Sequence, residues 1–188
     1  MHSSVFAWVP RALSADEVRG RRVLEVGSYN VNGSVRPIVQ GYGPARYEGV
    51  DQTPGPGVDL VMPCERLPEL FSAPDTFDVV ISTEMLEHAK DWRVCMLAMA
   101  AVVTPGGLLI LTTRSPGFPY HPFPDDHWRF TTAMMAAILP ALGLEPLSIV
   151  DDPDPRAPGV FVKARKPLDW QPPAATVLDA IDAVEVIR

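Results

Sequence analysis

Short apolar segments alternate with helix-compatible segments along much of the chain, and this alternation constrains the fold more than any other feature. Five segments are rich in β-branched residues or leucine and end in Gly, Pro, Asp or polar signals. These strand candidates are residues 22–27, 46–51, 58–61, 77–82 and 108–113. The helix candidates between them are residues 34–40, 65–72 and 92–103. Apolar strands separated by helices form parallel sheets that helices cover on both faces. The sequence therefore predicts an α/β domain with a doubly wound, mostly parallel sheet.

The C-terminal part of the chain has a different pattern. Beyond residue 145, two further strands joined by a proline-rich turn are predicted, the clearer one at "GVFVKA". In the tail, residues 167–188, Val177, Ile181 and Val184 have helix-compatible spacing after two prolines. We expect this tail to dock as a helix, either on the core or on another subunit.

Length, charge and cysteine content limit the function. The chain of 188 residues suits a single domain spanning 1–188. With 16 Lys and Arg against 23 Asp and Glu, the net charge of -7 disfavours nucleic acid as a partner. The longest apolar run, residues 94–103, is half the length that a membrane span needs, so no membrane association is expected. Two cysteines without CxxC spacing and no signal-peptide pattern indicate a cytoplasmic protein.

Polar residues and glycine follow the first two strand candidates. Gly27 begins the loop "GSYNVNG", and Asp51 ends the second strand. In doubly wound sheets ligands bind beyond the carboxyl ends of the strands, and an acid at this spacing accepts hydrogen bonds from ribose hydroxyls. The loop lacks the GxGxxG pattern that cradles a pyrophosphate. We therefore expect a nucleoside ligand without a pyrophosphate.

Four segments in this order resemble the class I S-adenosylmethionine-dependent methyltransferases, in their small-molecule branch. The segments are "VLEVGSYNVNG", "YEGVD", "FDVVISTEMLEHAKDW" and "VVTPGGLLILTT", and the resemblance covers most of residues 21–165. It implies S-adenosyl-L-methionine as the cofactor, a small-molecule acceptor such as a sugar or secondary metabolite, and an antiparallel hairpin at the end of the sheet.

The resemblance also implies which residues bind the cofactor. Those residues are Glu25, Gly27, Ser28, Asn32, Asp51, Gln52, Cys64, Glu65, Ser82 and Glu84. Glu25 would face the cationic methionine end, Asp51 the ribose and Gln52 the adenine. Pro63 stands where relatives often have an acid, so adenine recognition through backbone groups is expected. The structural alternatives are that Glu25 pairs with Arg22 or a lysine, and that Asp51 is only a turn or capping residue.

A proline-rich and aromatic segment, residues 115–131, forms the predicted acceptor loop, because it follows the fifth strand candidate and prolines prevent regular helix there. His121 and His127 in this loop, with His88 from the preceding region, are the candidate general bases. The structural alternative is that Asp126 and Arg129 form an ion pair that fixes the loop while Thr131 caps the next helix. No metal site is predicted, because the ligand spacing is not dense enough.

The expected reaction is methyl transfer to an oxygen or nitrogen nucleophile. Two alternatives stay open: a noncatalytic binding module that keeps the cofactor fold, and a nicotinamide-dependent oxidoreductase. A homodimer is compatible with the sequence.

Overall fold

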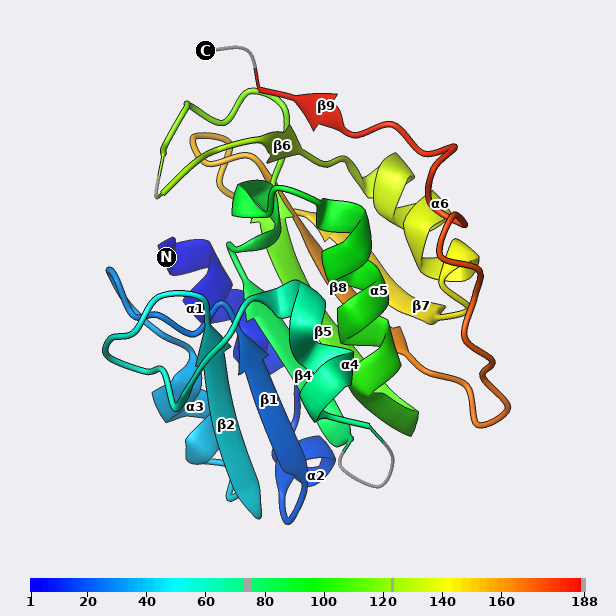
Figure 1. Cartoon of the computed structure of the whole chain (residues 1–188). Helices are drawn as coiled ribbons and strands as arrows, with labels where there is room; N and C mark the ends of the chain where they lie inside the picture. The colour runs from blue at the N-terminus through cyan, green and yellow to red at the C-terminus, as the bar shows by residue number, and fades with distance from the viewer. Residues whose placement is uncertain (73–75, 123, 187–188) are drawn as a thin grey trace.

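The computed structural model describes residues 1–72, 76–122 and 124–186. The α-helices are α1 Ser3–Ala12, α2 Ala15–Val18, α3 Arg36–Gln40, α4 Leu67–Leu70, α5 Trp92–Val102 and α6 Thr132–Ala141, and the 3-10 turns are η1 Cys64–Arg66 and η2 Leu86–His88. The strands are β1 Arg22–Val26, β2 Arg46–Asp51, β3 Leu60–Val61, β4 Phe77–Thr83, β5 Val103–Arg114, β6 Trp128–Arg129, β7 Glu145–Asp151, β8 Gly159–Arg165 and β9 Val184–Glu185. Figure 1 shows their arrangement.

The main sheet has the strand order β3-β2-β1-β4-β5-β8-β7. The pairs from β3 through β5 are parallel, whereas β8 runs antiparallel to both β5 and β7. The predicted doubly wound, mostly parallel sheet with a C-terminal antiparallel hairpin is therefore confirmed. The order reverses between β1 and β4, and such a switch point is where open α/β sheets bind ligands.

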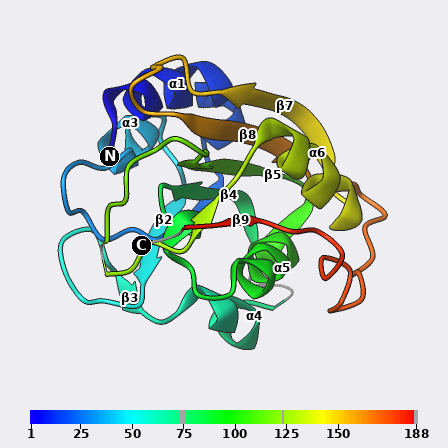
Figure 2. The ribbon, with the colours of Figure 1, turned by 90° about the horizontal axis from the view of Figure 1, so that it is seen from above.

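Two apolar cores cover the two faces of this sheet, because successive side chains of a strand point to opposite faces. In β1, Val23 packs with α1, α2 and α3, whereas Leu24 packs with α4, α5 and α6. Ile110 and Leu111 of β5 divide between the two cores in the same way. Figure 2 shows α1 and α3 on one side of the sheet and α4 and α5 on the other.

Some elements differ from the sequence prediction. Residues 58–61 yield only the two-residue β3, and the helix expected at 65–72 is a 3-10 turn followed by the single turn of α4. Helix α1 was not predicted, and it contains Pro10, a residue that disfavours the interior of a helix. Its buried Val5 and Val9 face the sheet, and this burial outweighs the hydrogen bond that a proline removes from a helix.

The predicted helix in the tail is wrong, although the tail does dock on the core. Residues 175–180 form turns, and β9 pairs with β6. Leu178 is fully buried in the larger core. The Arg93 guanidinium donates to the carbonyl oxygens of Leu178 at 3.0 Å and Ile181 at 2.5 Å. The Leu178 carbonyl oxygen also accepts from the Ile181 amide at 3.0 Å, so separate turns and a side chain of α5 hold this segment where a helix was expected.

Candidate active site

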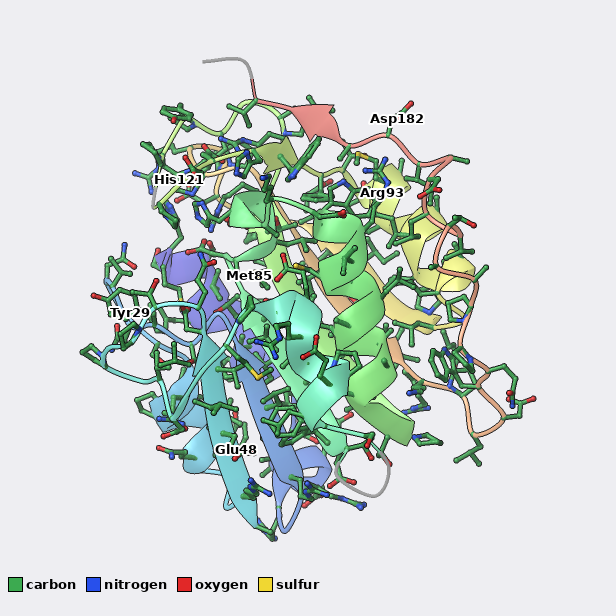
Figure 3. All side chains as sticks on the ribbon, in the orientation of Figure 1. Tyr29, Glu48, Met85, Arg93, His121 and Asp182 are labelled. Atoms are coloured by element: carbon green, nitrogen blue, oxygen red, sulfur yellow. The ribbon has the colours of Figure 1, made fainter. Side chains whose placement is uncertain are left out.

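Two adjoining cavities open beyond the carboxyl ends of β1, β2 and β4. The first cavity has a volume of about 480 Å³ and is bordered by Cys64, Glu65 and His127. The second has a volume of about 460 Å³ and is bordered by Glu25, Glu84 and His121. Both cavities share Gly27, Asp51, Gln52, Met85, His88 and Pro124. Figure 3 labels Tyr29, Met85 and His121 at this end of the sheet, and Glu48 toward the other end.

The loop after β1 must bend sharply at Gly27. Its φ of 76° lies in the left-handed region, and a Cβ atom there would stand 2.5 Å from Cγ of Met85. The amides of Gly27 and Ser28 both donate to the carbonyl oxygen of Val50, at 2.9 and 3.0 Å. A glycine is therefore required by backbone conformation and by packing, apart from any ligand.

Glu25 is the acid within the apolar strand β1, and it is 2% exposed. Its carboxylate accepts a hydrogen bond of 2.9 Å from the Tyr47 hydroxyl of β2. Burial raises the pKa of Glu25 to about 7, although the hydrogen bond from Tyr47 opposes that shift. Tyr47, a neutral donor, thus takes the place of the Arg22 or lysine partner in the structural alternative, and the nearby cation that lowers the pKa is Arg36. At neutral pH this carboxyl group can gain or lose a proton when a charged ligand enters the second cavity.

Asp51 connects the loops after β1 and β2. One carboxylate oxygen accepts from the Tyr29 amide at 3.2 Å and the other from the Thr53 amide at 2.8 Å. Asp51 is thus a turn residue, as the structural alternative held, and it also borders both cavities. A carboxylate has about four acceptor sites, so these two bonds leave capacity for ligand hydroxyls.

The other predicted cofactor residues divide between the cavities. Ser28 and Asn32 border only the second cavity, while Gln52 borders both. Cys64 and Glu65 border the first, and the Cys64 thiol lies 3.7 Å from the Cys95 carbonyl oxygen.

Ser82 does not occupy the predicted position. β4 continues through Thr83, so Ser82 lies inside the strand, is fully buried and borders neither cavity. Thr83 and Glu84 reach the second cavity instead. Glu84 forms an ion pair with Arg114, which is itself buried, and accepts from the His2 amide at 3.1 Å. The negative charge of Glu84 is therefore already balanced by the protein.

The structure brings two of the three predicted histidines together. The rings of His88 and His121 are 4.8 Å apart between centroids, and both border the second cavity. Burial lowers the pKa of His88, and burial together with the neighbouring His88 lowers the pKa of His121. Both shifts favour the neutral imidazole. His127 borders only the first cavity, and its backbone amide donates to the Glu87 carbonyl oxygen at 2.9 Å.

An ion pair holds the loop that carries His121. Arg129 donates to the two carboxylate oxygens of Asp126 at 2.5 and 2.7 Å, and both residues are buried. Burial acts to raise the pKa of Asp126, but the hydrogen bonds from Arg129 and from the His121 amide lower it to about 2. Thr131 caps α6 by accepting from the Met134 amide at 3.2 Å. The structural roles considered for these loop residues are confirmed.

Sequence reasoning missed Glu87, which is fully buried beside the two histidines. Burial raises the pKa of its carboxyl group to about 7. Its position directly before His88 was the available signal, but adjacent residues usually face different directions. The sequence also gave no indication that Met1 and His2, ahead of α1, border the second cavity.

Comparison with known proteins identifies the family. A family model described as a methyltransferase domain matches residues 1–135, which is more than half of the chain, and the chain belongs to this family. A ubiquinone biosynthesis O-methyltransferase of Neisseria meningitidis is 30% identical over 110 residues, which cover 52% of this chain and 45% of that protein. The matches to the other ubiquinone biosynthesis O-methyltransferases cover 18 to 26% of those proteins, so the matched segments span less than half of these relatives.

Solved structures share the fold at low identity. An S-adenosylmethionine-dependent methyltransferase from Mesorhizobium loti has a TM-score of 0.66 at 16% identity, covering 87% of this chain and 98% of that one. The 1,6-didemethyltoxoflavin-N1-methyltransferase of Burkholderia thailandensis, solved with 1,6-didemethyltoxoflavin and S-adenosylhomocysteine, has the same TM-score and identity, covering 88% and 77%. Among the described residues, no helix is long and apolar enough to cross a lipid bilayer.

Proposed function

We propose that the chain binds S-adenosylmethionine across the two cavities and transfers its methyl group to an oxygen or nitrogen atom of a small molecule. The observation that carries this proposal is the position of Glu25, Gly27 and Asp51. All three border adjoining cavities beside the strand-order switch of a methyltransferase-family fold. Membership in the family supports the reaction class, and the cavities supply space for a cofactor and an acceptor.

The charges at the two ends of the site favour one orientation of the cofactor. Adenosine fits the first cavity, where Asp51 can accept from the ribose hydroxyls and Gln52 lies beside the adenine. The methionine end then enters the second cavity, where Glu25 offers a carboxyl group to the ammonium and sulfonium charges. Glu84 contributes less to this attraction, because its carboxylate is paired with Arg114.

The acceptor would occupy the part of the second cavity next to the acceptor loop. There its nucleophilic atom attacks the methyl carbon as the carbon–sulfur bond breaks, the electron pair stays on sulfur, and neutral S-adenosylhomocysteine leaves. Alignment and exclusion of water supply most of the acceleration, since orientation alone can contribute about 7 to 11 kcal/mol. His88 and His121 are better placed than His127 to take an acceptor proton, because they border the second cavity.

A methyl-transfer assay separates this proposal from its alternatives. The chain is incubated with S-adenosylmethionine labelled in the methyl group and with a panel of phenols, hydroxylated sugars and amines. We expect protein-dependent label in one acceptor class, and much less with Asp51→Ala. Binding of S-adenosylhomocysteine without transfer to any acceptor would favour a noncatalytic module, and saturable binding of NAD would favour an oxidoreductase. Whether the protein acts as a homodimer stays a prediction, which sedimentation would test.

A further inference from the structure

Three metal-ligand side chains converge at the border of the second cavity. Glu87, His88 and His121 each offer one ligand atom, and these atoms all lie within 4.8 Å of one another. Nε2 of His121 is 3.9 Å from Oε1 of Glu87. Two imidazoles and one carboxylate are a ligand set found in zinc and non-haem iron sites.

Hydrogen bonds fix both imidazoles in the tautomer that a metal site needs. Nδ1 of His88 contacts the carbonyl oxygen of Asp125, and a carbonyl oxygen can only accept. Nδ1 of His121 lies 3.0 Å from the carboxylate of Asp126, which Arg129 keeps ionised. Both rings therefore carry their hydrogen on Nδ1 and present Nε2 as a lone pair. Metal-binding histidines are oriented by carbonyl and carboxylate acceptors in the same way.

Glu87 supplies the third lone pair from the protein interior. It is fully buried, and its Oε2 accepts a hydrogen bond of 2.8 Å from the Thr113 hydroxyl. Its Oε1 is also buried and has no hydrogen-bond partner among the described residues. In the ionised form this buried oxygen lacks a donor, which is costly, and the imidazole lone pairs beside it cannot serve as donors.

These observations share one explanation. We propose that Glu87, His88 and His121 bind one divalent transition-metal ion at the border of the second cavity. Ligand atoms around a tetrahedral ion stand about 3.3 Å apart, given metal–ligand bonds near 2.0 to 2.1 Å. The spacing in the structure is wider, so the side chains close inward when the ion binds. His121 can make this movement, because its side chain is 34% exposed and belongs to a loop.

The ligand set also indicates the kind of ion and its open position. Imidazole suits Zn²⁺, Fe²⁺, Ni²⁺ and Cu²⁺ better than Mg²⁺, Ca²⁺ or Mn²⁺, which prefer oxygen ligands. Three protein ligands leave at least one position for a further donor, as in catalytic sites. That position borders the second cavity, where the hydroxyl of an acceptor could enter and lose its proton more readily. With the ion bound, the two imidazoles would bind the metal and would no longer take the acceptor proton themselves. This use of the ion rests on the proposed function, whereas binding of the ion does not depend on it.

Metal titration of the full chain tests the site directly. Protein freed of metal by a chelator and dialysed is titrated with Co²⁺, whose visible absorption bands report coordination, and with Zn²⁺ by calorimetry. We expect saturation at one ion per chain, and affinity weaker by at least about 100-fold in His121→Ala and Glu87→Gln. Mg²⁺ at the same concentration should give no comparable binding. His127→Ala, which removes an imidazole outside the cluster, should bind Co²⁺ like the parent.

Each result is decisive. The proposal is overturned if the parent shows no saturable binding, or if His127→Ala weakens binding as much as His121→Ala does. If Glu87→Gln does not fold, His88→Ala and His121→Ala decide, with thermal unfolding as the check on folding. A separate titration with S-adenosylhomocysteine keeps the two proposals distinct. If the parent binds the metal but does not bind S-adenosylhomocysteine, only the proposed function is rejected. If the parent binds S-adenosylhomocysteine but takes up no ion, only the metal site is rejected.

Discussion

The Tyr47 hydroxyl donates a hydrogen bond to the Glu25 carboxylate at 2.9 Å, from one central strand to its neighbour. This neutral donor only partly offsets the loss of water around a buried acid, and the pKa of Glu25 stands at about 7. The acid is therefore partly protonated in the free protein near neutral pH. A cation placed beside it would favour the ionised form and release the proton.

Cofactor binding should consequently release protons near neutral pH. The ammonium group of S-adenosylhomocysteine, placed beside Glu25, lowers the pKa of that residue, so part of a proton leaves when binding occurs at pH 6.5. Calorimetry in buffers of different ionisation enthalpy measures the number of protons released per molecule bound. Glu25→Gln, which keeps an acceptor for Tyr47, should show no such release. Equal proton release in the parent and the variant would place the cofactor ammonium elsewhere.

The same residue predicts how stability depends on pH. The pKa of Glu25 is raised in the folded state from 4.5 to about 7, so the folded state holds more protons than the unfolded state between these values. The free energy of unfolding therefore falls as pH rises through this window, by up to about 3 kcal/mol from this one group. Glu25→Gln should remove the Glu25 share of that slope, while the share of Glu87, whose pKa is also raised to about 7, should remain. The variant should unfold at a higher temperature than the parent at pH 8, as calorimetry can measure.

The contact between Gly27 and Met85 predicts a coupled pair of substitutions. Gly27→Ala places a Cβ 2.5 Å from Cγ of Met85 and also keeps a positive φ, so we expect a loss of roughly 2 to 4 kcal/mol. Gly20→Ala is the matched control, since Gly20 has a φ of 70° and, apart from its chain neighbours, no atom of the described residues lies within 4 Å of the added Cβ. Only the strain of the backbone, about 1 to 2 kcal/mol, should appear there. Met85→Gly, which removes both the Cγ and the Cβ that lies 2.6 Å from the added atom, should restore part of the stability of Gly27→Ala but none of that of Gly20→Ala, as urea unfolding would show.

Arg93 should hold the tail in place. Its guanidinium binds two carbonyl oxygens of the tail and stacks over Trp92 at 4.5 Å. Arg93→Ala should therefore raise amide hydrogen exchange in residues 174–186 by at least about tenfold, because each hydrogen bond from a charged group contributes about 1.5 to 3 kcal/mol. Arg156→Ala, which removes an exposed pair with Asp154, should leave tail exchange unchanged. An equal effect of both variants would mean that other contacts dock the tail.

The central part of the fold was predictable because its residues follow strong local patterns. The bounds of β2 match the prediction at 46–51, and Gly27 and Asp51 lie at strand ends where the alternation of strands and helices places them. The tail was not predictable, since helical spacing at Val177 and Ile181 cannot show that Arg93, far away in sequence, binds two carbonyl groups of the tail. Ser82 was misplaced because a single further residue in β4 moves the strand end to Thr83.

Candidate site residues were predictable where each one lies at the end of a strand that the sequence already indicates. They were not predictable where the contact joins side chains from separate segments of the chain. The pairing of His88 with His121 depends on how the acceptor loop folds over η2, and the Asp126–Arg129 ion pair fixes that loop. Glu87 belongs to the same arrangement, because its position beside His121 arises only once the loop is in place. Local sequence patterns carry no information on such contacts.

Calorimetric titration with S-adenosylhomocysteine tests the central claim most directly. We predict saturable binding at one molecule per chain, no saturable binding of NAD, and affinity at least about tenfold weaker in Asp51→Ala, because charge-assisted hydrogen bonds to ribose contribute about 1.5 to 3 kcal/mol each. Asp51→Asn is the second variant in case Asp51→Ala does not fold, because asparagine keeps one acceptor oxygen for the loop amides. Absence of binding, or unchanged affinity in both folded variants, would contradict the assignment of these cavities to the cofactor.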